Sequence, residues 1–213
     1  MQVTRLFPRT LEDGEYLENV CNFAARRCRT LKTHNQLWDE VIGWTPQKRS
    51  SFFGQVVHQD WALDVLELTH LVLDWEGVPL WLIIELLRHR FIARDFSLEQ
   101  LSQRAITASE MQILAPDWMQ PHIRNYLDAI QADPEFSDTP PEDLRAGFFQ
   151  GTLVNLVVAG NVRSWQHVFN MRAPKIAGGR GGAHPLFQEL AMASFESARE
   201  VYPLALSQGI IPA

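Results

Sequence analysis

The sequence predicts an α+β fold, a single domain in which a mixed or antiparallel sheet is flanked by helices. Segments with helical spacing occur at both ends of the chain, and a β-branched apolar run, TLVNLVVA at residues 152–159, lies between them. With 213 residues, of which 46% are apolar, the chain can bury a core without disulfides or structural metals. We therefore expect one domain that spans residues 1–213.

The first predicted helix covers residues 10–29, because Thr10 and Asp13 resemble a capping box and apolar residues follow at helical spacing. Residues 43–60 are turn-rich and aromatic. Residues 66–75 carry mixed apolar residues that suit a strand or a helix, and their second half favours a strand. The clearest helix covers residues 77–90, GVPLWLIIELLRHR, which has proline near its start and three cations at its end.

The second half of the chain continues this alternation. Residues 116–131 predict a helix, and a Pro- and Asp-rich surface connection follows at residues 133–143. The apolar run at 152–159 predicts a buried strand. Residues 161–172 and 185–199 predict two helices, which flank the glycine-rich segment AGGRGGA.

Charge and cysteine content narrow the function classes. The chain has 19 Lys+Arg and 25 Asp+Glu, a formal charge of −6, which argues against a long electrostatic contact with a nucleic-acid polymer. Cys21 and Cys28 share one predicted helix without a histidine at metal-ligand spacing, so we expect no metal site and a reduced, cytoplasmic protein. No apolar run approaches the roughly 20 residues that a membrane span requires.

Three polar clusters could carry chemistry. The triplet Arg88, His89 and Arg90 could bind phosphate or a flavin anion, or could simply complement a helix dipole. The segment SLEQLSQR at residues 97–104 has the composition of a loop around a polar ligand, or of an ordinary polar turn. In the helix at residues 161–172, polar residues repeat at helical spacing, which a solvated face would also explain.

Together, these clusters resemble the signature of the flavin-dependent thymidylate synthase family. That signature is R-H-R, a short gap, S-x-N-E-x-S-x-R-Y and, far downstream, an N-x-R-S helix that ends in Leu-Arg. The resemblance spans about residues 68–203 with gaps. It implies a flavin-dependent thymidylate synthase-like fold and a homotetramer whose active sites are shared between subunits.

The resemblance also implies roles for individual residues. The expected FAD-binding residues are Arg88, His89, Arg90, Asn161, Arg163 and His167, the last three acting from a neighbouring subunit. The expected substrate-binding residues are Glu85, Gln100, Ser102, Gln103, Arg104, Arg145 and Arg172. Among them, Arg172 matches the arginine that contacts the pyrimidine ring, and it is the expected catalytic residue.

The implied reaction is C5 methylation of a pyrimidine nucleoside monophosphate, dUMP to dTMP by default. Methylenetetrahydrofolate would be the one-carbon donor, reduced FAD the hydride source and NADPH its reductant. A guanidinium aimed at O2 and N3 would stabilise negative charge in the ring and enrich C5 as a nucleophile. Arg172 alone does not separate uracil from cytosine, so we expect base specificity at the N4 or O4 edge.

Several residues depart from the family pattern. Glu99 and Gln100 replace Asn-Glu, and Ala105 replaces the final Tyr. Glu85 stands where the family usually has Gln beside the nucleotide, and a carboxylate there would repel a phosphate. These changes leave open another substrate (dCMP or UMP), hydroxymethylation, or a nucleotide- or flavin-binding protein without turnover.

The loop AGGRGGAHP after Arg172 is a further departure, because it is longer than in the family. Arg180 stands at its centre, between glycines that can adopt conformations closed to other residues. The loop could be a lid, a site for a different substrate group or a surface insertion.

Overall fold

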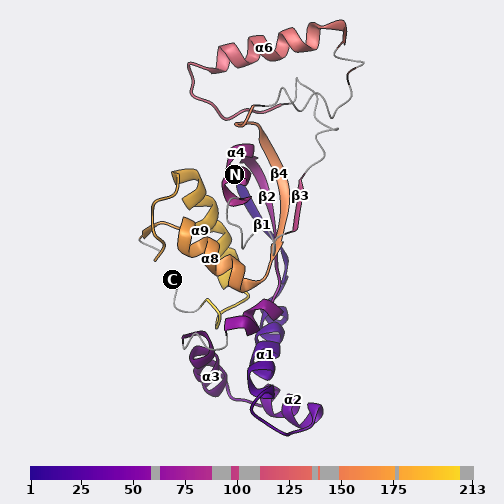
Figure 1. Cartoon of the computed structure of the whole chain (residues 1–213), viewed down its shortest axis with the longest axis vertical. Helices are drawn as coiled ribbons and strands as arrows, with labels where there is room; N and C mark the ends of the chain where they lie inside the picture. Colours follow the sequence, from indigo (N-terminus) through magenta and orange to yellow (C-terminus); the bar gives the residue numbers. More distant parts are fainter. Residues whose placement is uncertain are drawn as a thin grey trace.

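In the computed structural model, a four-stranded sheet lies at the centre of an elongated molecule (Figure 1). The structure describes residues 1–58, 63–87, 97–100, 111–135, 139, 149–175 and 178–206. Among the helices within these ranges, none is long and apolar enough to cross a membrane.

The sheet is antiparallel throughout. Its order is β1 (Gln2–Phe7), β2 (Leu71–Pro79), β4 (Leu153–Gly160) and β3 (Ser97–Gln100). Along β2, Leu71, Leu73 and Trp75 are buried and alternate with half-buried residues, as in a sheet that packs one face on the core. The predicted α+β class, with an antiparallel sheet flanked by helices, is confirmed.

Two helices, α8 (Val162–Arg172) and α9 (Pro185–Arg199), pack against the sheet (Figure 1). Trp75 of β2 meets Trp165 of α8 edge to face, with 5.8 Å between ring centroids. The indole nitrogen of Trp75 also donates a hydrogen bond to the hydroxyl of Ser194 in α9, at 3.1 Å. Burial of each such ring contributes about 1.5–3 kcal/mol, so this aromatic contact is a major part of the core.

The lower end of the molecule in Figure 1 consists of helices. These are α1 (Leu11–Arg27), α2 (His34–Ile42), α3 (Pro46–His58) and the short 3-10 helix η1 (Leu63–Leu68). The predicted capping box of α1 is confirmed, because the Thr10 hydroxyl accepts from the Asp13 N–H and the Asp13 carboxylate accepts from the Thr10 N–H. The basic turn RRCR, residues 26–29, ends α1 and leads toward α2.

Two expectations about local structure are wrong. Residues 46–58 form helix α3 and not turns, because the Thr45 hydroxyl accepts from the Lys48 N–H and Phe53 becomes fully buried. The segment expected to be a loop or turn from Ser97 begins as strand β3, which pairs with β4 over four residues. Without β3, β4 would be the edge strand of the described sheet, and β3 satisfies backbone groups of β4 that would then be exposed.

The other predicted elements lie close to their expected positions. A strand does begin at Leu71, in the second half of the ambiguous segment. Helix α4 covers Leu80–Leu87. A further expectation, that residues 77–79 begin this helix, is wrong, because β2 continues to Pro79, which pairs with Leu153, and residues 88–90 lie outside the described ranges. Helix α6 covers Gln120–Ala132, and α9 has the predicted bounds.

Candidate functional site

Arg172, the residue expected to face the pyrimidine ring, lies where α4, α8 and α9 meet. It is the last residue of α8, and its Nη2 lies 3.8 Å from Oε2 of Glu85 in α4. The guanidinium also lies over the ring of Phe187 in α9, 4.9 Å from the centroid. The Arg172 side chain is 17% exposed, and that of Glu85 is 35% exposed. A carboxylate and an aromatic face together therefore orient this cation.

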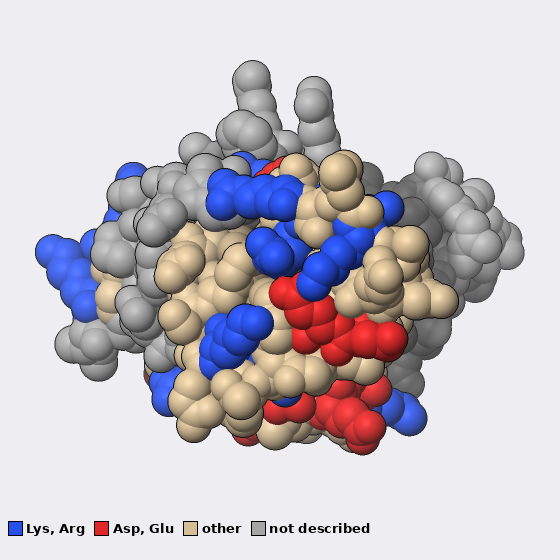
Figure 2. Space-filling model, turned by 90° about the horizontal axis from the view of Figure 1, so that it is seen from below, with Lys and Arg blue, Asp and Glu red and all other residues tan. Residues whose placement is uncertain are grey.

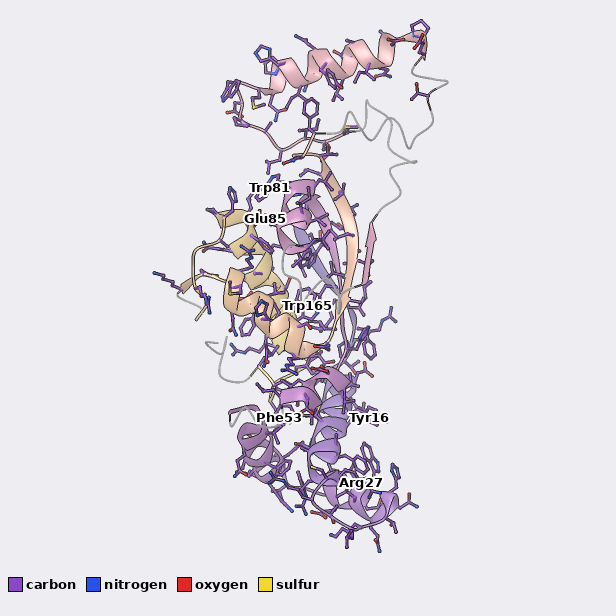
Figure 3. All side chains as sticks on the ribbon, in the orientation of Figure 1. Tyr16, Arg27, Phe53, Trp81, Glu85 and Trp165 are labelled. Atoms are coloured by element: carbon purple, nitrogen blue, oxygen red, sulfur yellow. The ribbon has the colours of Figure 1, made fainter. Side chains whose placement is uncertain are left out.

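A second contact joins α4 to α9 beside this pair. Trp81 precedes Glu85 by one helical turn, so both side chains lie on the same face of α4 (Figure 3). The Trp81 ring packs edge to face on the imidazole of His184, with 4.8 Å between centroids. Nδ1 of His184 in turn accepts a hydrogen bond from the Leu186 N–H at the start of α9. These contacts hold the first turns of α4 and α9 together.

His167 contributes a half-buried imidazole from the middle of α8. Burial lowers the pKa of this imidazole from its ordinary value, and the positive charges of Arg180 and Arg172 lower it further. The neutral imidazole, which both donates and accepts a hydrogen bond, is therefore favoured near neutral pH. The same two charges make this part of α8 electropositive.

The glycine-rich loop folds back onto the end of α8. The Arg180 N–H donates a hydrogen bond to the Asn170 carbonyl at 2.9 Å. A Cβ added to Gly179 would lie only 2.1 Å from the carbonyl oxygen of Ala173, so no larger residue fits there without a shift. Gly181 has a φ of 70°, which side chains rarely adopt. The described part of the loop is thus anchored to α8, which argues against a loose surface insertion.

Asn161 and Arg163 lie at the opposite end of α8. The Asn161 side chain caps the helix, because its Oδ1 accepts from the Ser164 N–H at 2.9 Å. Arg163 is exposed and forms an ion pair with Glu67 of η1. Arg163 and Arg172 are separated by about 13 Å along the helix axis, at about 1.5 Å per residue. Within one chain, the structure therefore does not bring these residues to the predicted ring-facing arginine.

Several predicted site residues lie outside the described ranges. They are Arg88, His89, Arg90, Ser102, Gln103, Arg104 and Arg145. For Gln100 the structure gives the backbone, which is the last residue of β3 and lies opposite Leu156 of β4. The described part of the site is therefore the part that α4, α8, α9 and the glycine-rich loop form.

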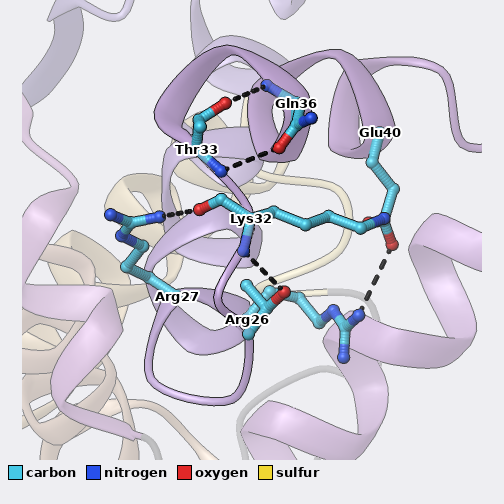
Figure 4. A network of polar contacts seen from close by, with 7 residues as sticks. Arg26, Arg27, Lys32, Thr33, Gln36 and Glu40 are labelled. Atoms are coloured by element: carbon cyan, nitrogen blue, oxygen red, sulfur yellow. Dashed lines mark hydrogen bonds and ion pairs between the residues drawn. The ribbon is translucent and has the colours of Figure 1, made fainter.

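The end of the molecule formed by α1, α2 and α3 carries charges of both signs. Figure 2 shows Lys and Arg side chains beside Asp and Glu on this end. Glu40 of α2 pairs with Lys32 at 2.7 Å and with Arg26 at 3.6 Å (Figure 4). The hydrogen bond from Lys32 holds the pKa of Glu40 below its usual value. These pairs join α1 to α2, so we attribute this basic turn to the fold and not to ligand binding.

Comparison with protein-family profiles assigns the chain to a family. The profile described as thymidylate synthase complementing protein matches residues 12–204. The chain belongs to this family. The expected resemblance to flavin-dependent thymidylate synthases is thereby confirmed, and so is the prediction of an enzyme of this type.

Two solved structures are similar in fold to this chain. One is flavin-dependent thymidylate synthase ThyX from Helicobacter pylori complexed with FAD and dUMP, with a TM-score of 0.65, 15% identity, and coverage of 95% of this chain and 97% of that chain. The other is the UMP/dUMP methylase PolB from Streptomyces cacaoi bound with 5-Br dUMP, with a TM-score of 0.66, 14% identity, and coverage of 100% of this chain and 97% of that chain. Among curated proteins, none matches this sequence.

Sequence reasoning about the family overlooked three side chains of the site. Trp81, His184 and Phe187 flank the pair of Arg172 and Glu85, but none of the three was assigned a role from the family signature. The helical spacing between Trp81 and Glu85 is a signal that could have identified the first of them. The other two follow the glycine-rich loop, where a proline marks the start of α9. Their role depends on how α9 packs, which no local pattern reveals.

Proposed function

We propose that this protein adds a one-carbon unit to C5 of a pyrimidine nucleoside monophosphate, using reduced FAD and methylenetetrahydrofolate. The default reaction is methylation of dUMP to dTMP. The alternatives are dCMP or UMP as the substrate in place of dUMP, and hydroxymethylation in place of methylation. The observation that carries the proposal is the Arg172 guanidinium, which Glu85 and the Phe187 ring hold at the end of α8. A fixed donor group of this kind suits a ring that gains negative charge during the reaction.

The residues around α8 suit an anionic cofactor such as FAD. The charges of Arg172 and Arg180 both lower the pKa of His167, and Arg163 adds an exposed guanidinium. Guanidinium groups and a neutral imidazole can donate hydrogen bonds to phosphate and flavin oxygens. We therefore assign FAD binding to Arg88, His89, Arg90, Asn161, Arg163 and His167. When bound and reduced by NADPH, FAD supplies the hydride that completes the methyl group.

Arg172 would act directly on the substrate ring. Its N–H groups would donate to O2 and to N3, which accepts in cytosine and in uracil that has lost its N3 proton, and the positive charge would stabilise the electron density that makes C5 nucleophilic. C5 then forms a bond to the methylene carbon of the folate, and both bonds from that carbon to the folate nitrogens break. The C5 proton and one further proton end on these nitrogens, and a hydride on the methylene carbon gives the methyl group. The phosphate and sugar would be bound by Ser102, Gln103, Arg104 and Arg145, with Gln100 nearby, whereas Glu85, next to Arg172, would lie beside the base.

A homotetramer with shared active sites is part of this proposal. Its support is the separation of Asn161 and Arg163 from Arg172 at opposite ends of α8, about 13 Å apart along the helix. If Asn161 and Arg163 contact the FAD of a neighbouring subunit, as proposed, the two ends of α8 contribute to two different active sites. Mixing two inactive variants, Arg163→Ala and Arg172→Ala, should then restore part of the activity.

The decisive experiment follows the oxidation state of the flavin. The purified chain is loaded with FAD, reduced anaerobically, and mixed with methylenetetrahydrofolate and with dUMP, dCMP or UMP in turn. Reoxidation that depends on one nucleotide, with a C5-methylated product, would support the proposal. A bound flavin that no pair reoxidises would contradict it in favour of a binding protein without turnover. Failure to bind FAD would contradict the cofactor assignment itself.

A further inference from the structure

The pair formed by Glu85 and Arg172 has a definite pattern of hydrogen-bonding groups. Arg172 has only donors, and the carboxylate of Glu85 has only acceptors. Their nearest atoms, Nη2 and Oε2, are 3.8 Å apart, so the two kinds of group stand side by side. A glutamine at this position would offer both a donor and an acceptor. The glutamate therefore makes this edge of the site selective in a way that glutamine would not.

This pattern can be compared with the edges of the two pyrimidines. Cytosine presents acceptors at O2 and N3 and a donor at its N4 amino group. Neutral uracil presents acceptors at O2 and O4 with a donor at N3 between them. A guanidinium that faces O2 and N3, next to a carboxylate that faces position 4, complements cytosine. With uracil, O4 would meet the carboxylate oxygen, and two acceptors would repel each other.

We propose that Glu85 is a specificity-determining residue that makes this site select a cytosine nucleoside monophosphate over its uracil counterpart. The inference rests on the proposed function, in which Arg172 faces the base. Glu85 is suited to the role because its side chain remains 35% exposed while one of its oxygens lies toward Arg172. The Phe187 ring under the guanidinium limits the movement of Arg172, so Glu85 keeps a fixed neighbour.

The pair would also favour reaction at C5 of cytosine. A carboxylate that accepts from the N4 amino group increases electron release from N4 into the ring. The guanidinium at O2 and N3 stabilises the charge that accumulates there. Both effects make C5 more nucleophilic, and neither needs a covalent bond between enzyme and substrate. The same two residues would thus bind the base and polarise it.

The test compares the native chain with Glu85→Gln, which keeps the shape and removes the charge. Binding of dCMP and dUMP to the FAD-loaded protein is measured by titration calorimetry, and kcat/KM is measured by flavin reoxidation. We expect the native protein to prefer dCMP by roughly 10- to 100-fold, and Glu85→Gln to lose or reverse this preference. Glu196→Gln changes the same charge at an exposed position of α9, and it should retain the native preference.

Each other outcome has a distinct meaning. If the native protein binds and converts dUMP in preference to dCMP, the proposed function stands and cytosine selection is wrong. If Glu85→Gln weakens both nucleotides by the same factor, Glu85 only positions Arg172, and the specificity role is again wrong. If FAD is bound but neither nucleotide binds, the proposed function itself fails. Because the native preference is measured first, the inference remains testable even if Glu85→Gln does not fold.

Discussion

Glu85 and Glu18 are two shielded carboxylates in regions of different kinds. Glu85 contacts the guanidinium of Arg172 and remains partly exposed between α4 and α8. Glu18 of α1 is fully buried, and its Oε1 accepts from the backbone N–H groups of Leu204 and Ala205, each at 2.9 Å. Glu18 is removed from bulk water, whereas Glu85 is only partly shielded and has a charged partner in contact. The comparison indicates that Glu18 serves the fold, whereas Glu85 serves the site.

The surroundings of Glu18 support a structural role. Residues 201–206, which we term the C-terminal clasp, pack closely on α1: a Cβ on Gly14 would lie 1.6 Å from the Val201 carbonyl oxygen. In the clasp, the Tyr202 hydroxyl hydrogen-bonds the backbone of His70 at the start of β2. Burial raises the pKa of Glu18 to about 7. The clasp thus joins α1 to the start of β2.

Replacing Arg172 by Ala should have the largest effect, and it should fall on turnover and not on folding. We expect kcat to decrease by about 100- to 1000-fold, because one fixed donor to the charged ring is lost. FAD should stay bound to this variant, since FAD binding is assigned to other residues. In His89→Ala, by contrast, the loss of FAD should be the primary effect. Absorbance spectra and flavin reoxidation measure the two effects. Normal turnover of Arg172→Ala would show that this arginine does not polarise the base.

Glu18→Gln should have its effect on stability and not on turnover. The folded pKa of Glu18 is about 7, against an ordinary value of 4.5. Its contribution to the free energy of unfolding is therefore full below pH 4.5 and is lost as pH rises through about 7, by roughly 3 kcal/mol. Glutamine does not titrate, so the variant should gain stability relative to the native protein at higher pH.

The measurement is urea unfolding of both proteins at about pH 5 and about pH 8. The quantity to compare is the difference in unfolding free energy between the two proteins at each pH. The lowered pKa of His167 makes the folded state more stable as pH rises, and this effect is the same in both proteins and cancels in the difference. Equal pH dependence in both proteins would mean that Glu18 is not the titrating group.

Gly179→Ala should affect the site through its supporting loop. The new Cβ would meet the Ala173 carbonyl oxygen at 2.1 Å, so the loop must shift, at a cost of about 1–3 kcal/mol. Arg180 would move with it, and FAD affinity should weaken. Gly182→Ala is the matched control, because its Cβ would have nothing within 4 Å. Thermal unfolding and FAD titration that do not separate the two variants would argue against an anchored loop.

Glu40→Gln should have the smallest effect, since its ion pairs with Lys32 and Arg26 lie near the surface. We expect the free energy of unfolding to fall by less than about 1 kcal/mol, and by even less at high salt. Unfolding curves at two salt concentrations measure this. A loss of several kcal/mol would mean that ion pairs at this end matter as much as the buried Glu18.

Local signals predicted the ends of several helices. Thr10 and Asp13 form the expected capping box, and Asn161 caps α8 as the first residue of the predicted helix. The signals failed for α3 and β3. Phe53 of α3 is stabilised by burial in the core, and β3 exists through pairing with β4. Both depend on partners that a short window of sequence does not contain.

The sequence by itself determined the α+β class, the family and the residues expected to bind FAD and nucleotide, because capping patterns, apolar periodicity and motifs are local. Only the tertiary structure decided which of them meet. The contact of Glu85 with Arg172 joins α4 to α8, and the contact of Trp81 with His184 joins α4 to α9. Such contacts depend on how helices pack over the sheet, which is a property of the whole core and not of any one segment.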